Sequence, residues 1–336
     1  MVKETPTWAV VATIDEPPAL VQAFVAWHLS LGAAQIFLYC DRPRDAVQAR
    51  LVHLPQVTVV PCDAAHWRRL GKSRPRRHQV RQVRNARDAY TRTTADWILH
   101  CDADEFVRAG VPVSDALRDV PAETACLLLH VAERVHPLGE MGAHIFDGAF
   151  RRPFRVPQKR GVALFGADYA LTYRGLTGHS QGKAFVRTGR SLHMSIHRPR
   201  PATADQEVIS ARAAIEAMEL LHFEGLTQTY WAYKLARMVH ALQERDGMPP
   251  SDHRRRQADE LIAAPSAAAA LYQRLKCPDA QAIAQLRKRG LWDDRVFDPS
   301  QAVARYFPDQ IADPSLQNVD RWLNRHKKRV ADYLLK

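Results

Sequence analysis

An apolar run ends in a group of carboxylates in the segment Trp97–Val107, which reads WILHCDADEFV. The carboxylates are those of Asp102, Asp104 and Glu105. Ionised carboxylates behind a buried strand cost free energy unless cations or hydrogen-bond donors receive them. Asp102 and Asp104 have the same parity on an extended segment, so both side chains point to one side. Two oxygen donors at this spacing suit Mg²⁺ or Mn²⁺ bridged to phosphate groups, and a single aspartate there would also suit helix capping.

An apolar strand followed by acids is also typical of the second nucleotide-binding motif of P-loop ATPases. That reading requires a phosphate-binding loop of the form G-x-x-x-x-G-K-[ST]. The nearest match is GLTGHSQGKAF at Gly175–Phe185, which follows the acids and has a different glycine spacing. Ala184 stands where a serine or threonine should hold the metal. The sequence therefore disfavours a P-loop ATPase.

The first hundred residues alternate between β-rich and helix-like stretches. We expect strands at Trp8–Ile14, Ala34–Cys40, Gln56–Cys62 and Asp96–Asp102. We expect helices at Ala19–Gly32, Asp45–Leu54 and Arg76–Thr94. This alternation predicts an α/β fold in which helices flank a mostly parallel sheet, and ligands bind such sheets at the carboxyl ends of the strands. Acids follow every expected strand: Asp15, Glu16, Asp41, Asp45, Asp63, Asp102, Asp104 and Glu105.

The predicted secondary structure changes twice in the rest of the chain. Short β-rich runs at Ala125–Val135, Lys183–Arg187 and Leu192–Arg198 are separated by loops containing glycine and proline. After Pro201 the sequence favours helices, including Thr203–Phe223 and Thr227–Arg245. We therefore expect a catalytic domain over residues 1–200, a helical segment completing the active site over 201–250, and a helical extension over 251–336.

The composition is that of a basic globular protein. The formal net charge is +12 and the isoelectric point is about 9.7, which favours an anionic partner such as a phosphorylated substrate, nucleic acid or an anionic membrane. No RNA-binding signature or zinc-finger spacing is present, so specific nucleic-acid recognition has little support. The five scattered cysteines form no C-x-x-C motif, and no secretory signal or apolar run of membrane-spanning length is visible. We expect a cytoplasmic protein with peripheral contact to the inner face of the membrane.

Five stretches between residues 8 and 240 occur in a set order: FVAWHLSLGAAQIFLYCD, HQVRQVRNARDAY, ADWILHCDADEFV, GHSQGKAFVRTG with SIHRP, and LLHFEGLTQTYWAYKLAR. Together they resemble family 2-like glycosyltransferases with the GT-A fold. The acidic segment is similar to the D-x-D-E-F signature of one subgroup. Two positions depart from the family pattern: Cys40 follows Tyr39 where an acid is usual, and Ala23 replaces a glutamate. These departures concern the contacts to the base and ribose.

The resemblance implies transfer of a sugar from a nucleotide-sugar donor with the help of Mn²⁺ or Mg²⁺. It implies that Asp104 is a direct metal ligand and that Asp102 contacts the ribose or reaches the metal through water. A late histidine would supply a third ligand, and the candidates are His222 and His197. A structural role is the alternative for each histidine.

Further donor contacts are expected around these ligands. Asp15 and Asp41 would lie near the nucleobase, Arg84 and Asn85 would face the donor, and Lys183, Arg187 and Lys234 would contact the diphosphate. Helix capping and solvated surface charge are the alternatives for these residues. An inverting enzyme also needs a general base for the acceptor hydroxyl, for which Glu105 and Asp147 are the candidates, with Glu140 and Glu133 as alternatives.

The expected function is therefore that of a glycosyltransferase in surface or extracellular polysaccharide synthesis. Its partners would be a UDP- or GDP-linked sugar and a glycan or lipid-linked acceptor. Two other functions fit parts of the same pattern: a nucleotidyltransferase, and a basic nucleic-acid-binding protein whose acids only cap helices.

Overall fold

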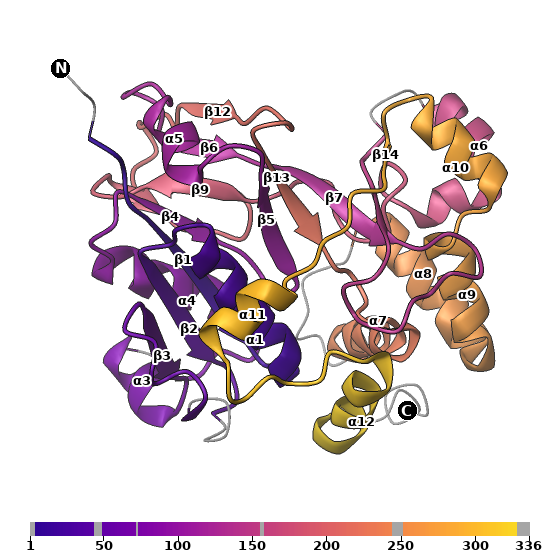
Figure 1. Cartoon of the computed structure of the whole chain (residues 1–336), viewed down its shortest axis with the longest axis horizontal. Coiled ribbons are helices and arrows are strands. Elements are labelled where there is room, and N and C mark those ends of the chain that lie inside the picture. The colour runs from indigo at the N-terminus through magenta and orange to yellow at the C-terminus, as the bar shows by residue number, and fades with distance from the viewer. Residues whose placement is uncertain (1–3, 44–48, 72, 155–157, 244–250, 328–336) are drawn as a thin grey trace. The chain divides into compact units, whose positions relative to one another are not determined.

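The computed structural model describes residues 4–43, 49–71, 73–154, 158–243 and 251–327 (Figure 1). The chain divides into two compact units that interleave along the sequence. The first comprises Met1–His130, Gln181–Leu220 and Pro299–Ala312. The second comprises Val131–Ser180, Leu221–Asp298 and Asp313–Lys336. This division rests on packing alone, and the functional division at residues 200 and 250 stays a prediction.

The first unit is built on a seven-stranded sheet with the order β12-β6-β9-β4-β1-β2-β3. Strands β1, β2, β3 and β4 are mutually parallel, β9 is antiparallel to both β4 and β6, and β12 is parallel to β6. The predicted α/β class is confirmed. The strands are β1 (Trp8–Ile14), β2 (Gln35–Cys40), β3 (Val57–Pro61), β4 (Trp97–His100), β6 (Cys126–Leu128), β9 (Ala184–Arg187) and β12 (Ser210–Arg212).

The helices of this unit pack closely on the sheet and on one another. Helix α4 (His78–Arg92) packs against β1, and α1 (Pro18–Ser30) packs against α11 (Ser300–Tyr306). Proline stands in the first turn of α1, where its missing N–H removes no helical bond. Gly32 ends α1 in the left-handed conformation, with φ of 92°. This unit also contains the short helices α3 (Ala64–Arg69) and α5 (Val113–Arg118).

Two further strand pairs belong mainly to this unit. Strand β5 (Glu105–Ala109) continues directly from the acidic turn and neighbours β13 (Met218–His222). Arg108 of β5 forms a salt bridge with Glu219 of β13. A short antiparallel pair is formed by β10 (Leu192–His193) and β11 (Arg200–Pro201).

The second unit is mainly helical. Its antiparallel strands are β7 (His130–Val135), β8 (Ala149–Arg151) and β14 (Trp292–Asp293). Helix α7 (Gln228–Gln243) packs against α8, α9 and α12. The other helical elements are α6 (Gln158–Phe165), η1 (Gly166–Leu171), α8 (Asp252–Ala263), η2 (Pro265–Ala267), α9 (Ala268–Lys276), α10 (Ala280–Arg287) and α12 (Leu316–His326). The expected helical C-terminal region is therefore confirmed.

The helix predicted over Thr203–Phe223 is wrong. Strands β12 and β13 occupy this segment, and α7 begins only at Gln228. Alanine, glutamate and leucine favour a helix locally, but pairing of β12 with β6 and burial of all of β13 override that preference. The strand predicted over Leu192–Arg198 shortens to β10, and the helix expected at Asp45–Leu54 lies partly outside the described residues.

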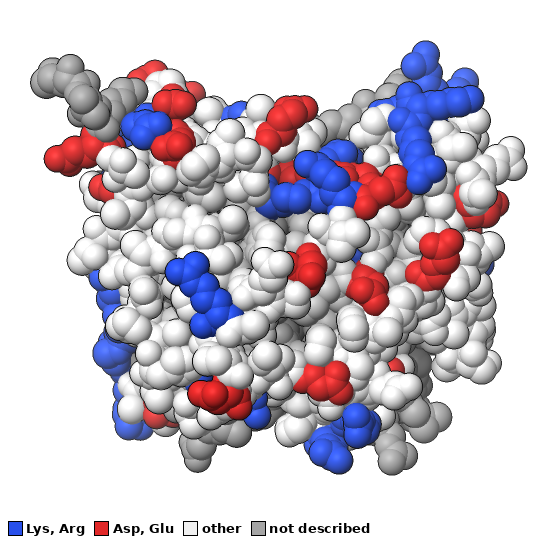
Figure 2. All heavy atoms as spheres, viewed as in Figure 1, with Lys and Arg blue, Asp and Glu red and all other residues white. Residues whose placement is uncertain are grey.

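Every helix among the described residues is too short or too polar to cross a lipid bilayer. On the face drawn in Figure 2, acidic and basic side chains are interspersed, and much of the described surface there is uncharged.

Candidate functional site

A tight turn carries the acidic residues from the end of β4 into β5. The Glu105 N–H donates to the Asp102 carbonyl at 3.0 Å, and the Asp102 N–H donates to the Glu105 carboxylate at 2.8 Å. Glu105 is completely buried, so its carboxylate clamps the turn from inside. Asp104 lies at the tip of the turn and is 8% exposed. The turn thus fixes the relative positions of Asp102 and Asp104.

The Asp102 carboxylate is oriented by two side chains from other elements. Gln82 of α4 donates to one oxygen, and Lys183, which directly precedes β9, donates to the other at 3.0 Å. The Asp102 side chain keeps 31% of its surface exposed. Burial opposes ionisation, but the charges of Lys183 and His100 outweigh it and hold the pKa of Asp102 well below its usual range. Asp102 is therefore a charged and accessible carboxylate.

Lys183 is a buried cation that serves two carboxylates. Its ammonium lies 3.0 Å from Asp102 and 3.3 Å from Glu105, and its side chain is fully buried. Burial alone would lower the pKa of Lys183, but the two carboxylates raise it above its usual value. Gly182, with φ of 67°, lets the backbone before Lys183 pass close to the Leu129 carbonyl, because any side chain at this position would collide with that carbonyl. Lys183 thus lies beside the acids with its charge directed at them, and its contact with a diphosphate stays a prediction.

A second buried ion pair lies at the end of β2. Asp41 receives Arg81 through both oxygens, at 2.6 and 2.7 Å, and also receives Arg74 at 3.1 Å. Burial raises the pKa of Asp41, but the hydrogen bonds and charge of Arg81 outweigh that effect and lower it overall. Because two arginines already hold Asp41, its first role in this structure is to anchor the Arg74–Arg81 segment.

Asn85 lies inside the unit, and its side-chain amide forms hydrogen bonds with neighbouring side chains. It donates to Thr13 at 2.9 Å and accepts from His66 at 2.9 Å. It is completely buried, so the structure places it beneath the sheet edge and away from the surface. Arg84 on the same helix is half-buried and lies 3.5 Å from the Ser73 carbonyl.

Asp15, His197 and Arg187 differ in where they lie. Asp15 follows β1 and is 3.7 Å from Arg42. His197 shares a hydrogen bond of 2.9 Å with the Gly182 carbonyl, next to Lys183. Arg187 instead pairs in register with Trp97, at the opposite end of β4 from the acids, and donates to the Thr124 carbonyl at 3.1 Å. The structure therefore does not bring Arg187 together with the acidic turn.

The late candidates His222 and Lys234 meet in the second unit around Glu224. Glu224 is buried and lies 3.0 Å from Lys234, 3.1 Å from Arg254 and 3.5 Å from His222. Burial opposes ionisation of Glu224, but the charges of Lys234 and Arg254 hold its pKa well below the usual range. The His222 ring stacks on His179 with centroids 5.2 Å apart. These side chains form a compact ionic cluster, which we call the Glu224 cluster.

Asp147, the candidate base, accepts the N–H groups of Ala143 and His144 at 2.7 and 2.8 Å. It is half-buried and stabilises the loop that precedes β8. The alternative Glu133 is completely buried and accepts from Thr177, Gly178 and Lys276. Glu133 is therefore part of the interior of the second unit.

The sequence singled out the acids but missed several side chains that hold them. Gln82 orients Asp102, His100 lies behind it with a hydrogen bond of 2.9 Å to the Ser195 carbonyl, and Arg254 completes the Glu224 cluster. Gln82 lies in the same helical stretch as Arg81 and Asn85, and this spacing is the signal that could have marked it. His100 carries no such signal, because it reads as the last residue of a buried strand.

No protein-family model matches this sequence, and no curated protein is similar to it in sequence. Two examples show how distant its likeness to solved structures is. TarS residues 1–349 from S. aureus is 10% identical with a TM-score of 0.30, covering 98% of this chain and 89% of that one. HddC from Yersinia pseudotuberculosis is 10% identical with a TM-score of 0.28, covering 55% of this chain and 74% of that one. Scores this low carry no argument about function.

Proposed function

We propose that the protein is a metal-dependent glycosyltransferase that moves a sugar from a nucleotide-sugar donor to a glycan or lipid-linked acceptor. The observation that carries the proposal is the acidic turn after β4. It presents a charged, accessible Asp102 and a fixed Asp104 at the carboxyl edge of the sheet, where α/β folds bind ligands. The α/β fold and the position of these two acids directly after a buried strand support the proposal.

The donor set fits a hard divalent cation. Asp102 already receives one hydrogen bond on each oxygen, from Gln82 and Lys183, and these bonds leave it better suited to a ribose hydroxyl or a metal-bound water. Asp104 is then the direct protein ligand, as the resemblance implies. Mn²⁺ or Mg²⁺ bound there would neutralise charge on the diphosphate leaving group. His222, in the second unit, stays the predicted third ligand, with His197 as the alternative.

The chain's own residues supply orientation and charge. Lys183 and Gln82 hold Asp102 in one rotamer, and Glu105 keeps the turn closed from inside. Because its carboxylate is tied to the Asp102 N–H, we assign Glu105 a positioning role. Asp147 stays the predicted general base for an acceptor hydroxyl.

A thermal-shift panel tests the proposal directly. We expect UDP or GDP, and the matching sugar nucleotide, to raise the melting temperature only when Mn²⁺ or Mg²⁺ is present. CMP- and dTDP-sugars complete the panel and identify the base. Stabilisation by nucleoside triphosphates alone would favour a nucleotidyltransferase, and a response to oligonucleotides alone would favour nucleic-acid binding. Either result would overturn the proposal.

A lipid-linked acceptor would place the enzyme at an anionic membrane surface. The segment Arg68–Arg87 is rich in arginine, but Arg69, Arg74 and Arg81 pair with Asp88 or Asp41 inside the first unit. Arg68, Arg77 and Arg87 are exposed and would carry the contact. We expect weak, salt-sensitive sedimentation with anionic vesicles, and equal sedimentation with neutral vesicles at low salt would contradict it.

A further inference from the structure

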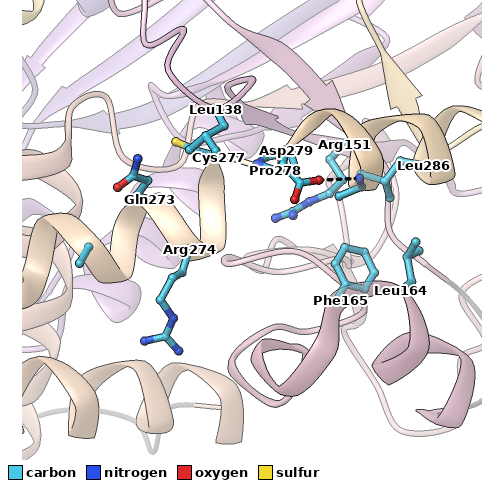
Figure 3. A pocket seen from close by; sticks show the side chains of 12 residues that line it. Leu138, Arg151, Leu164, Phe165, Gln273, Arg274, Cys277, Pro278, Asp279 and Leu286 are labelled. Atoms are coloured by element: carbon cyan, nitrogen blue, oxygen red, sulfur yellow. Dashed lines mark hydrogen bonds between the residues drawn. The ribbon is translucent and has the colours of Figure 1, made fainter.

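The second unit contains a pocket of about 510 Å³ between helices α6, α9 and α10, with β8 at its base (Figure 3). This volume is in the range of small-molecule sites, about 300–1,000 Å³. Its apolar lining includes Leu138, Leu164, Phe165 and Leu286. None of these residues belongs to the acidic turn or to the Glu224 cluster, so the pocket is a separate feature of the fold.

A buried arginine forms the polar base of this pocket. Arg151 is 3% exposed, donates from Nη2 to the Leu275 carbonyl at 3.0 Å, and lies over the Phe165 ring at 5.6 Å. Among the described residues, no acceptor lies within hydrogen-bonding distance of its Nε–H. This nitrogen is also closed off from the pocket, so a ligand would meet the guanidinium group through its charge and not through this N–H.

The charge beneath the pocket is unbalanced. Glu133 is shared by two buried cations, with Lys276 at 3.1 Å and Arg151 at 3.7 Å. One carboxylate between two cations leaves one positive charge in excess. In a poorly solvated interior such an excess attracts an anionic group to the side of Arg151 that faces the pocket.

An acid lines the same pocket at its rim. Asp279 is exposed and caps α10, accepting the Ala282 N–H at 2.8 Å. No ion pair joins Asp279 to Arg151 among the described residues, although both line the pocket. Figure 3 shows the Arg151 side chain extending into the space between Asp279 and Phe165. The pocket thus presents two opposite charges beside an apolar lining.

The other charged residue of the lining is already committed. Arg274 pairs with Asp168 and, at 3.0 Å, with Glu260 on the outside of the unit. Because two carboxylates already neutralise Arg274, we do not expect it to attract an anionic ligand into the pocket. Its substitution therefore serves as a control for the role of Arg151.

We propose that this pocket binds the zwitterion of a free apolar α-amino acid. The ligand's carboxylate faces Arg151, its ammonium group faces Asp279, and its side chain packs against Leu164, Phe165 and Leu286. Both charges of the pocket are then compensated. The site is independent of the proposed transferase site and gives the second unit a ligand of its own.

Calorimetric titration of the full chain with L-leucine and L-phenylalanine tests the ligand class. We expect saturable binding, and we expect leucinamide and N-acetyl-leucine, each lacking one charge, to bind at least about fivefold more weakly. Absence of saturable binding by both amino acids would overturn the proposal. Equal affinity for leucine and leucinamide would also overturn it, because the carboxylate would then contribute nothing.

Variants test the location. Asp279→Asn keeps a good helix cap but removes the charge, and we expect about threefold to fivefold weaker leucine binding. Ala282→Trp fills the pocket and should abolish binding, with folding checked by circular dichroism. Arg274→Gln is the matched control and should bind leucine like the parent. Unchanged binding in a folded Ala282→Trp variant would place the ligand elsewhere and refute this site.

Discussion

Two buried lysines, each beside carboxylates, show how similar chemistry serves different ends in the two units. In the first unit Lys183 lies 3.0 Å from Asp102, whose side chain remains 31% exposed. In the second unit Lys276 lies 3.1 Å from Glu133, and both side chains are fully buried. Glu133 also accepts hydrogen bonds from Thr177 and Gly178, so protein groups surround it. An exposed edge on the carboxylate, and not the presence of an ion pair, distinguishes the candidate site from the interior network.

The pKa values of the two lysines shift in opposite directions, which supports the same distinction between the two regions. Two carboxylates raise the pKa of Lys183 despite its burial. The pKa of Lys276 falls to about 8, because burial outweighs the charge of Glu133 and the nearby Arg134 and Arg151 oppose its charge further. The groups around Lys183 thus hold an excess of negative charge that a metal could balance, and those around Lys276 hold an excess of positive charge.

The largest expected effect is the loss of the interior network. Glu133→Gln leaves Lys276 and Arg151 without a counterion, and we expect it to lower the free energy of unfolding by about 3–5 kcal/mol. Asp102→Asn should lower it by only about 1 kcal/mol, because Glu105 still pairs with Lys183. Urea titration followed by circular dichroism measures both. Equal losses in the two variants would remove the distinction between network and site.

Acid should weaken the fold through histidines in both units. Burial lowers the pKa of His28 and His100 to about 4, and burial with the charges of Arg134 and Lys276 lowers that of His136 to about 2. Unfolding therefore takes up protons below pH 6.5, and stability falls as the pH falls from about 6.5 toward 4. Each proton contributes up to about 1.4 kcal/mol per pH unit.

Substitution of His136 allows the contribution of one of these protons to be measured. Among the described residues its ring nitrogens have no hydrogen-bond partner, so His136→Leu removes a titrating group without removing a bond. Urea titrations between pH 6.5 and 4 give the free energy of unfolding at each pH. In this variant we expect its slope against pH to fall by the amount that corresponds to about one proton taken up on unfolding. An unchanged slope would show that His136 is already protonated in the folded protein.

The proposed metal ligand gives the next effect in size. Asp104→Asn should weaken Mn²⁺-dependent binding of UDP or GDP by more than about 100-fold while changing the free energy of unfolding by less than about 1 kcal/mol. Asp63→Asn is the matched control, since Asp63 follows β3 and caps α3, and asparagine caps equally well. Calorimetry that shows the same affinity in both variants would remove Asp104 from the site.

The smallest effect separates the two late histidines. We expect His222→Ala to weaken metal-dependent donor binding by about tenfold, as loss of a ligand should. His197→Ala should cost mainly stability, about 1 kcal/mol, because its ring bonds the Gly182 carbonyl. Manganese titrations and thermal melts of both variants decide the assignment. The reverse pattern would move the ligand to His197 and leave the second unit out of the metal site.

The sequence predicts the central sheet well, because its parallel strands are continuous apolar runs separated by clear turn and helix signals. Strands β1, β2, β3 and β4 lie within the expected ranges. It fails at Thr203–Phe223, where long-range pairing decides the structure and local composition points to a helix. The acidic turn could be located because its residues are adjacent in sequence. Gln82 and Arg254 could not be assigned, because their roles arise from packing between distant segments.

The antiparallel direction of β9 has a consequence for the order in which the protein can fold. Because β9 runs against β4, its first residues lie at the carboxyl end of β4, and Lys183 meets acids that precede it by about eighty residues. A nascent chain that ends before β9 therefore contains the acidic turn but not its cation. Burying Glu105 at that stage would be unfavourable, so this edge of the sheet should close only after residue 187 has left the ribosome.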